Sequence, residues 1–487
     1  MDLQAAVNKS THVIDPSGAL DKTSLPDHVN VLSPDPDALP ARLTTEDRVL
    51  LVLKKGTKRP NALIEALLEK TVLGTVAEMT LLNVAERCSI NSIKNLSRLT
   101  DAKLATAPMT ADGSPPLTGV PAFIVGAGPS LDRNKQHLKA AAERGLIIAV
   151  DASAPAVRAA GVDPDVVVTL ESKHVSKMMT YNQTEPYRIF ACDITANPAN
   201  WEIPAHRKIA FSNIDPAYSV HLKALGAPPL SFGGCVSTAA LSLAYYWGCG
   251  PIILLGQDFA YTDGKAYCED MLYSEQTIER ILVPPSQGRD LIRFHGCPER
   301  GRDIDVTAVD VPGWCGTTAL TTHEMLVYRD WIGRIAKRLK TPVINATEGG
   351  VHIPFCPELT AEEVIRNLGR HTPMYSERID FFDLIDEMSP SQAGDITDLQ
   401  TSLRDITYEV EALIAETQEG GEWDSYYRLG DAIKKTPLFD AWMYHWVHSM
   451  KGGDTVLTLR EAIETRQDEL LRACRDIRSA LDWKGGE

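Results

Sequence analysis

Short apolar runs rich in β-branched residues alternate with amphipathic stretches through the middle of the chain. The runs predicted to be strands are Phe123 to Val125, Leu146 to Val150, Val166 to Thr169, Arg188 to Ala191, Lys208 to Ser212, Ile252 to Leu255 and Val343 to Asn345. Helices are predicted at 132–144, 153–160, 236–247 and 317–339. This alternation predicts an α/β fold with a central doubly wound, mostly parallel sheet, whose ligands bind beyond the carboxyl ends of the strands.

Flanking regions differ in composition from this centre. We predict a disordered or loosely ordered segment at 1–44, a small helical domain at 45–106, a linker at 107–119, the central α/β domain at 120–370 and an acidic C-terminal helical domain at 371–487. The first segment is rich in Pro, Asp and Ser without periodicity. The last has apolar residues at helical spacings.

Charge and cysteine usage limit the function classes. The 487 residues include 49 basic and 65 acidic side chains, a net charge of −16, which disfavours nucleic-acid and membrane-surface binding. Nine scattered cysteines without paired spacing fit reduced thiols. Because no signal-like segment or long apolar run occurs, we expect a cytoplasmic protein without membrane insertion. The oligomeric state stays open.

A glycine-rich turn follows the first central strand. Gly126 and Gly128 let a backbone approach an anion, and Ser130 can cap the next helix or donate to a phosphate. The turn is neither a dinucleotide fingerprint, since Leu131 stands where the third glycine belongs, nor a Walker loop. A tight strand-to-helix turn with a serine cap is the alternative.

Polar residues follow the next two strands. Asp151 and Ser153 can bind a ribose or base, or can cap the helix that follows. Glu171 can contact a sugar or a metal, or can be a solvated surface acid.

Three later junctions repeat this design. A second glycine-rich turn offers backbone and hydroxyl donors, or a plain helix cap, from Gly233, Gly234, Ser237 and Thr238. A buried strand ends in Gln257 and Asp258, which suit a site or an Asx turn. The last strand ends in Asn345, Thr347 and Glu348. His323, on the helix before it, is a candidate general base or a packed histidine.

Five motifs, in order and spacing, resemble one family. They are GAGPSLD at 126–132, GVDPDVVVTLES at 161–172, GGCVSTAA at 233–240, LLGQDFAYTDGK at 254–265 and INATEGG at 344–350. Together they are similar to the motility-associated factor (Maf) flagellin glycosyltransferases, whose central domain is shared with 6-hydroxymethylpterin diphosphokinase MptE-like proteins. The resemblance covers about residues 85–356.

The resemblance implies a sialyltransferase-like fold and transfer of a nonulosonic acid from a CMP-activated donor to Ser or Thr of flagellin. It also implies nucleotide binding by the two glycine turns, with no metal required. Asp258, Glu348 or His323 then deprotonates the acceptor. One departure is Tyr267, which stands where family members often carry histidine.

Two alternatives remain open. A 6-hydroxymethylpterin diphosphokinase uses ATP and Mg²⁺ and needs paired carboxylates after the third strand, where this chain has Thr169-Leu-Glu-Ser172 with one acid. A non-catalytic nucleotide-binding or flagellin-interaction protein is the other, with the acidic C-terminal region as its docking surface.

Overall fold

A computed structural model gives the structure of the chain. It describes residues 11–14, 29–32, 48–51, 84, 86–100, 102–105, 113–213, 230–284, 289–295, 304–368, 381–386, 393–418, 428–429 and 459–483. The chain divides into two compact units, Met1–Asn83 and Val84–Glu487.

The first unit contains a small parallel sheet. Its strands are β1 (Thr11–Ile14), β2 (Val29–Leu32) and β3 (Arg48–Leu51), in the order β2-β1-β3. β1 and β2, whose backbones pair in register, lie inside the segment at 1–44 that was predicted to be disordered or loosely ordered. Strand β3 likewise lies inside the predicted helical domain 45–106. Three short apolar runs spaced along a polar segment carry too little periodicity for sequence reasoning to find them.

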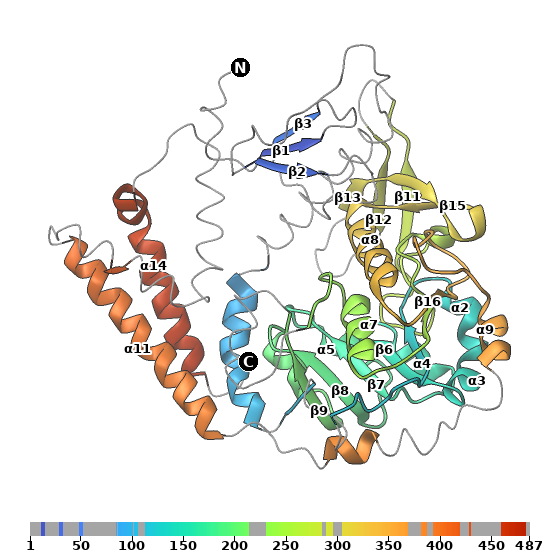
Figure 1. Cartoon of the computed structure of the whole chain (residues 1–487), viewed down its shortest axis with the longest axis horizontal. Coiled ribbons are helices and arrows are strands. Elements are labelled where there is room, and N and C mark those ends of the chain that lie inside the picture. Colours follow the sequence, from blue (N-terminus) through green and yellow to red (C-terminus); the bar gives the residue numbers. More distant parts are fainter. Residues whose placement is uncertain are drawn as a thin grey trace. The chain divides into compact units, whose positions relative to one another are not determined.

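The second unit is built on an eight-stranded parallel sheet of order β16-β10-β5-β6-β7-β8-β9-β4 (Figure 1). The strands are β4 (Lys103–Leu104), β5 (Ala122–Val125), β6 (Leu146–Val150), β7 (Val166–Thr169), β8 (Tyr187–Asp193), β9 (Ala205–Phe211), β10 (Ile252–Leu255) and β16 (Val343–Asn345). All seven predicted strands are confirmed. β5, β6, β7 and β10 are buried along their whole length, as covered parallel strands must be.

Helices cover both faces of this sheet because the chain reverses direction across it. From β5 the chain adds β6 to β9 on one side, through α2 (Leu131–Asn134), η5 (Lys135–His137), α3 (Leu138–Ala142) and α4 (Ala154–Ala159). It then returns through α7 (Val236–Tyr246) to place β10 on the other side of β5. Right-handed crossovers in opposite directions put these helices on opposite faces. α7 packs across β5, β6 and β7 (Figure 1). The predicted doubly wound fold is confirmed.

Two antiparallel additions were not predicted. One sheet joins β11 (Thr277–Ile281), β12 (Leu291–His295) and β13 (Ile304–Thr307), and a hairpin joins β14 (Val309–Pro312) to β15 (Thr318–Thr321). The predicted helix at 317–339 is therefore too long. α8 spans His323–Arg338, and Thr322 caps it by accepting from the Met325 N–H at 3.5 Å.

Short elements complete the connections between these strands. They are α5 (Ser176–Met179), η6 (Pro198–Glu202), η7 (Thr262–Gly264), η8 (Trp314–Gly316) and α9 (Ala361–Leu368).

Helices that precede and follow the sheet in sequence complete this unit. A helix at 86–94 runs into η4 (Asn95–Thr100), and α11 (Ala393–Gln418) pairs with α14 (Leu459–Leu481). Trp483, just after α14, makes two cation–π contacts. Lys94 Nζ and Arg98 Cζ lie 5.7 and 5.4 Å from the centroid of its ring. In the described part of the chain, every helix is too short or too polar to cross a bilayer.

Candidate functional site

The first glycine turn is filled by a carboxylate of the protein itself. Ser130 donates its hydroxyl to Asp258 Oδ1 at 2.6 Å, and its N–H faces both carboxylate oxygens at 3.3 Å. A Cβ on Gly128 would lie 2.0 Å from Asp258 Oδ1. The glycines therefore admit an anion, as predicted, but the anion is Asp258. Ser130 makes no helix-capping bond, so the alternative interpretation, a turn with a serine cap, does not hold.

Asp258 is almost fully buried, at 2 % exposure. Thr262 donates a second hydroxyl to it at 2.6 Å. Burial raises the pKa of Asp258 to about 6, and the bonds from Ser130 and Thr262 oppose that rise. A buried carboxylate needs several donors, and the loops after β5 and β10 supply them. This geometry makes Asp258 the link between the two loops.

The residues after β10 and β16 are joined in the same way. The Gln257 N–H donates to Thr347 Oγ1 at 3.1 Å, and Gly126 leaves room for the Gln257 amide. Asn345 Oδ1 accepts from the Thr347 N–H at 3.2 Å, whereas its buried Nδ2 has no hydrogen-bond partner among the described residues. All three predicted polar side chains are buried.

Glu348 caps α9. Its Oε1 accepts from the Ala361 N–H at 2.8 Å and from Asn134 Nδ2 at 3.3 Å, and its backbone oxygen accepts from Arg133 at 3.1 Å. Its φ of +59° is uncommon for a residue other than glycine. The carboxylate thus has a helix N-terminus as its partner.

His323 is the first residue of α8, and its Nε2 lies 3.1 Å from Arg289 Nη1. The three predicted bases therefore have different partners: Ser130 and Thr262 for Asp258, α9 for Glu348 and Arg289 for His323. Their assignment as bases stays a prediction.

A second group of polar side chains lies at the ends of β6 and β7. Asp151 accepts from Thr169 Oγ1 and from the Ala152 N–H, both at 2.8 Å. Burial raises its pKa to about 7, opposed by those two bonds, and the charge of Glu171 adds to the rise. Ser153 is fully buried, and its hydroxyl lies 2.6 Å from the Val125 oxygen. Ser153 therefore joins two strand ends.

The second glycine turn leads into α7. Gly234 is exposed with a φ of +82°, and a Cβ there would meet nothing within 4 Å. Thr238 Oγ1 accepts from the Gly233 N–H at 2.9 Å and donates to the Cys235 oxygen at 2.6 Å. Ser237 is also buried, at 7 % exposure. Thr238 thus shapes the turn, while Gly234 leaves open space before the helix N-terminus.

α7 contacts β6, β7 and α8, and groups on or beside these elements influence one another's pKa values. Burial, hydrogen bonds from Ser237 and Thr238, and the charge of Asp151 together set the raised pKa of Cys235. Burial and the charge of Glu324 raise the pKa of Tyr328, with smaller contributions from Cys235 and Glu171. Glu171, two residues beyond the end of β7, is half-buried.

Sequence reasoning missed two aromatic residues on α8. A Cβ on Gly233 would lie 2.6 Å from Cγ of Trp331, so the indole packs directly on the second glycine turn. Tyr328, three residues earlier, donates to Glu324 at 3.1 Å. Their i, i+3 spacing puts both on one side of α8, but nothing in the sequence shows which loop that side covers.

Tyr267 has an aromatic partner. The Tyr267 ring packs against Tyr273 with centroids 6.4 Å apart. The eight cysteines in the described part are free thiols, as predicted, and Cys297 lies outside it.

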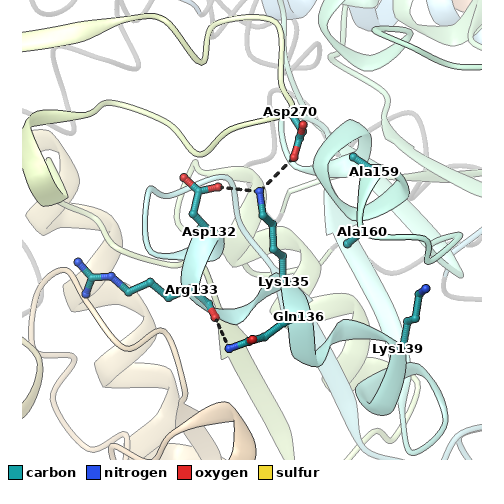
Figure 2. Close-up of a pocket in the computed structure, with 8 residues that line it drawn as sticks. All are labelled: Asp132, Arg133, Lys135, Gln136, Lys139, Ala159, Ala160 and Asp270. Carbon is teal, nitrogen blue, oxygen red and sulfur yellow. Dashed lines mark hydrogen bonds and ion pairs between the residues drawn. The ribbon is translucent and has the colours of Figure 1, made fainter.

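A separate open pocket of about 550 Å³ lies beside α2 and the end of α4 (Figure 2). Lys135 Nζ lies in it, 3.4 Å from Asp132 and 3.1 Å from Asp270. None of the predicted site residues lines this pocket, and the Lys135 charge is already neutralised by acids. We therefore place the candidate site at the start of α7 and the ends of β6 and β7.

Comparisons with known proteins agree with part of the sequence resemblance. Residues 90–264 match the family model described as 6-hydroxymethylpterin diphosphokinase MptE-like. This segment is similar to MptE-like proteins. It contains β5 to β10, both glycine turns, Asp151, Glu171 and Asp258, so the MptE-like resemblance expected from the motifs is confirmed there.

Two individual proteins are also similar. An uncharacterized protein of Treponema pallidum (strain Nichols) is 23% identical over 157 residues, which are 28% of this chain and 39% of that protein. A solved Maf glycosyltransferase from Magnetospirillum magneticum AMB-1 has a TM-score of 0.45 and 17% identity, covering 90% of this chain and 64% of that one. The chain thus spans less than two thirds of either protein.

Proposed function

We propose that this chain is a glycosyltransferase that moves a nonulosonic, sialic-acid-like sugar from a CMP-activated donor to Ser or Thr of flagellin or a similar surface protein. The observation that carries the proposal is that Gly234 precedes α7, Asp151 and Glu171 follow β6 and β7, and α7 packs on β6 and β7 of a doubly wound sheet. Such an edge suits nucleotides. The identities of the sugar and of the acceptor are inferred from the five motifs that resemble Maf proteins.

The start of α7 suits the donor phosphate. This helix has 11 residues, so its N-terminal N–H groups and dipole favour an anion. The open space at Gly234 leaves room for it to approach. Charge that develops on the phosphate as CMP leaves is stabilised there without a metal.

Asp151 and Glu171 suit the nucleoside. A carboxylate after the second strand of a doubly wound sheet can accept from ribose hydroxyls. Thr169 and the Ala152 N–H orient the Asp151 carboxylate, and Glu171 is accessible from solvent. Tyr328 and Trp331 provide the facing wall on α8.

The transfer balances without an added reactant. The bond between the anomeric carbon and the phosphate oxygen breaks, and its electron pair leaves with CMP. The acceptor hydroxyl oxygen forms the new bond to that carbon, and its proton passes to a base. Asp258, Glu348 and His323 stay the predicted bases, and the cytoplasmic location stays a prediction.

The test is a transfer assay with the full chain, a CMP-activated nonulosonic acid and flagellin. We expect release of CMP together with an increase in flagellin mass by one sugar residue. A parallel reaction contains ATP, Mg²⁺ and 6-hydroxymethylpterin. Diphosphate transfer in that reaction, with no sugar transfer in the first, would assign the diphosphokinase activity instead. If neither sugar transfer nor diphosphate transfer occurs, the result would favour a non-catalytic interaction protein.

A further inference from the structure

Two asparagines of the helix before the sheet reach the loops that follow β7 and β8. Asn91 Nδ2 donates to the Ser172 and Thr195 oxygens, both at 3.0 Å. Asn95 Nδ2 donates to the Ile194 and Ala196 oxygens at 2.8 and 2.7 Å. Both side chains are buried, and each amide uses both of its N–H donors.

The loop after β7 is held at three consecutive backbone oxygens. Asn200 Nδ2 donates to the Glu171 oxygen at 3.0 Å and to the Lys173 oxygen at 2.9 Å, and Asn91 takes the Ser172 oxygen between them. Arg87 Nε also donates to Ser172 Oγ at 3.0 Å. Two amide side chains thus fix the backbone at Glu171 and at the two residues that follow it.

Few other side chains can make these contacts. Two carbonyl oxygens on different loops require one short group with two donors and no charge to bury. An aspartate at position 91 would present acceptors to acceptors. The MptE-like match starts at residue 90, one residue before Asn91 and well before β5, so the part of the helix that carries Asn91 lies in the matched segment.

We propose that Asn91 is a positioning residue of the nucleotide site. It fixes the loop after β7 that carries Glu171, and this role rests on the proposed function. Asn95 also donates two hydrogen bonds, and both go to the neighbouring loop after β8. That loop carries no site residue. The helix at 86–94 is then part of the binding machinery.

Asn91→Ala and Asn95→Ala form a matched pair, since each removes two buried amide donors from the same stretch. Calorimetric titration with CMP measures the consequence. We expect Asn91→Ala to weaken CMP binding about tenfold more than Asn95→Ala, since a displaced loop misplaces its carboxylate. Equal loss of affinity in the two variants would overturn the proposal.

A second readout does not depend on CMP. Hydrogen exchange at the amides of residues 171–175 should be faster in Asn91→Ala than in Asn95→Ala, and the same in both if Asn91 has no special hold on the loop. If exchange is faster in Asn91→Ala than in Asn95→Ala but wild type binds no CMP, Asn91 keeps its positioning role and the proposed function is rejected. If Asn91→Ala does not fold, Asn91→Ser retains one donor and takes its place, with a smaller expected effect in the same direction.

Discussion

Ser130 and Asp258 lie 128 residues apart in sequence and are joined by a 2.6 Å hydrogen bond at the point where the sheet order reverses. The bond ties the loop after β5 to the loop after β10. Nucleotide-binding sheets commonly place a ligand at this position. Here a buried carboxylate takes it, and the open space lies one strand away, before α7.

Removing the Ser130 hydroxyl should destabilise the protein in a pH-dependent way. Ser130→Ala takes a donor from a buried carboxylate whose pKa is about 6, so the charged form suffers most. We expect a loss of about 1.5–3 kcal/mol in the free energy of unfolding at pH 8 and a smaller loss at pH 5. Urea denaturation measures both. The exposed Ser97→Ala control should change stability by less than about 0.5 kcal/mol. An equal loss at the two pH values would contradict the role of the bond.

Gly128 and Gly264 offer a comparison of close packing with backbone strain. A methyl group at Gly128 would meet Asp258 at 2.0 Å, whereas one at Gly264, with φ +71°, meets nothing within 4 Å. We expect Gly264→Ala to cost about 1–2 kcal/mol, from the left-handed conformation alone. Gly128→Ala should cost about 3 kcal/mol, because the carboxylate also loses its donors. Thermal unfolding compares them, and equal costs would contradict the close approach.

Asp151→Asn should change how stability depends on pH. The pKa of Asp151 is raised from 3.8 to about 7, so between these values the folded protein binds a proton that the unfolded chain has lost. Wild-type stability therefore falls as the pH rises through this interval, by about 1.4 kcal/mol per pH unit from this group. The variant lacks this loss, and its stability relative to wild type should rise from pH 5 to pH 7 and then level off.

Asp193→Asn is the control for that titration. Burial raises the pKa of Asp193 to about 6. The stability of Asp193→Asn relative to wild type should therefore also rise with pH, but it should level off about one pH unit earlier than that of Asp151→Asn. Urea denaturation at pH 5, 6, 7 and 8 resolves the two curves. Differences from wild type that stay constant over this range would show that neither group is protonated in the folded protein.

Thr238→Val should separate folding from binding. The substitution keeps the shape but leaves the Gly233 N–H without its acceptor and removes one of the bonds to the Cys235 oxygen, at a cost of about 1–3 kcal/mol. Thr407→Val is the matched control, because Thr407 is also fully buried and donates to the Arg404 oxygen at 2.7 Å. We expect both variants to lose stability and Thr238→Val alone to lose affinity for CMP. Equal affinities would exclude the second glycine turn from the site.

Strand positions were predictable because the sheet is buried on both faces. The run at Val166 to Thr169 has no polar residue before its last position, and such a run fits little else than a covered parallel strand. The short strands of the first unit and β15 escaped prediction because they are brief and flanked by polar residues. The apolar positions of β15 merged with those of α8.

The site was predictable only in its location. Parallel topology places Asp151, Glu171 and Gly234 at one edge, so sequence order was enough to bring them together. The partner of a buried side chain was not predictable: nothing near Ser130 in sequence indicates Asp258, and nothing near Asn91 indicates Ser172. Those pairings depend on loop geometry that only the folded chain defines.

Calorimetric titration of the full chain with CMP tests the central claim most directly, using Gly234→Val and Gly119→Val beside wild type. Both glycines are exposed, have φ near +80° and have nothing within 4 Å of an added Cβ, but Gly119 precedes β5 at the opposite end of the strands. We expect wild type and Gly119→Val to bind CMP with similar affinity and Gly234→Val to bind it at least about tenfold more weakly. Unchanged affinity in Gly234→Val, or no CMP binding by wild type, would rule out a nucleotide site before α7.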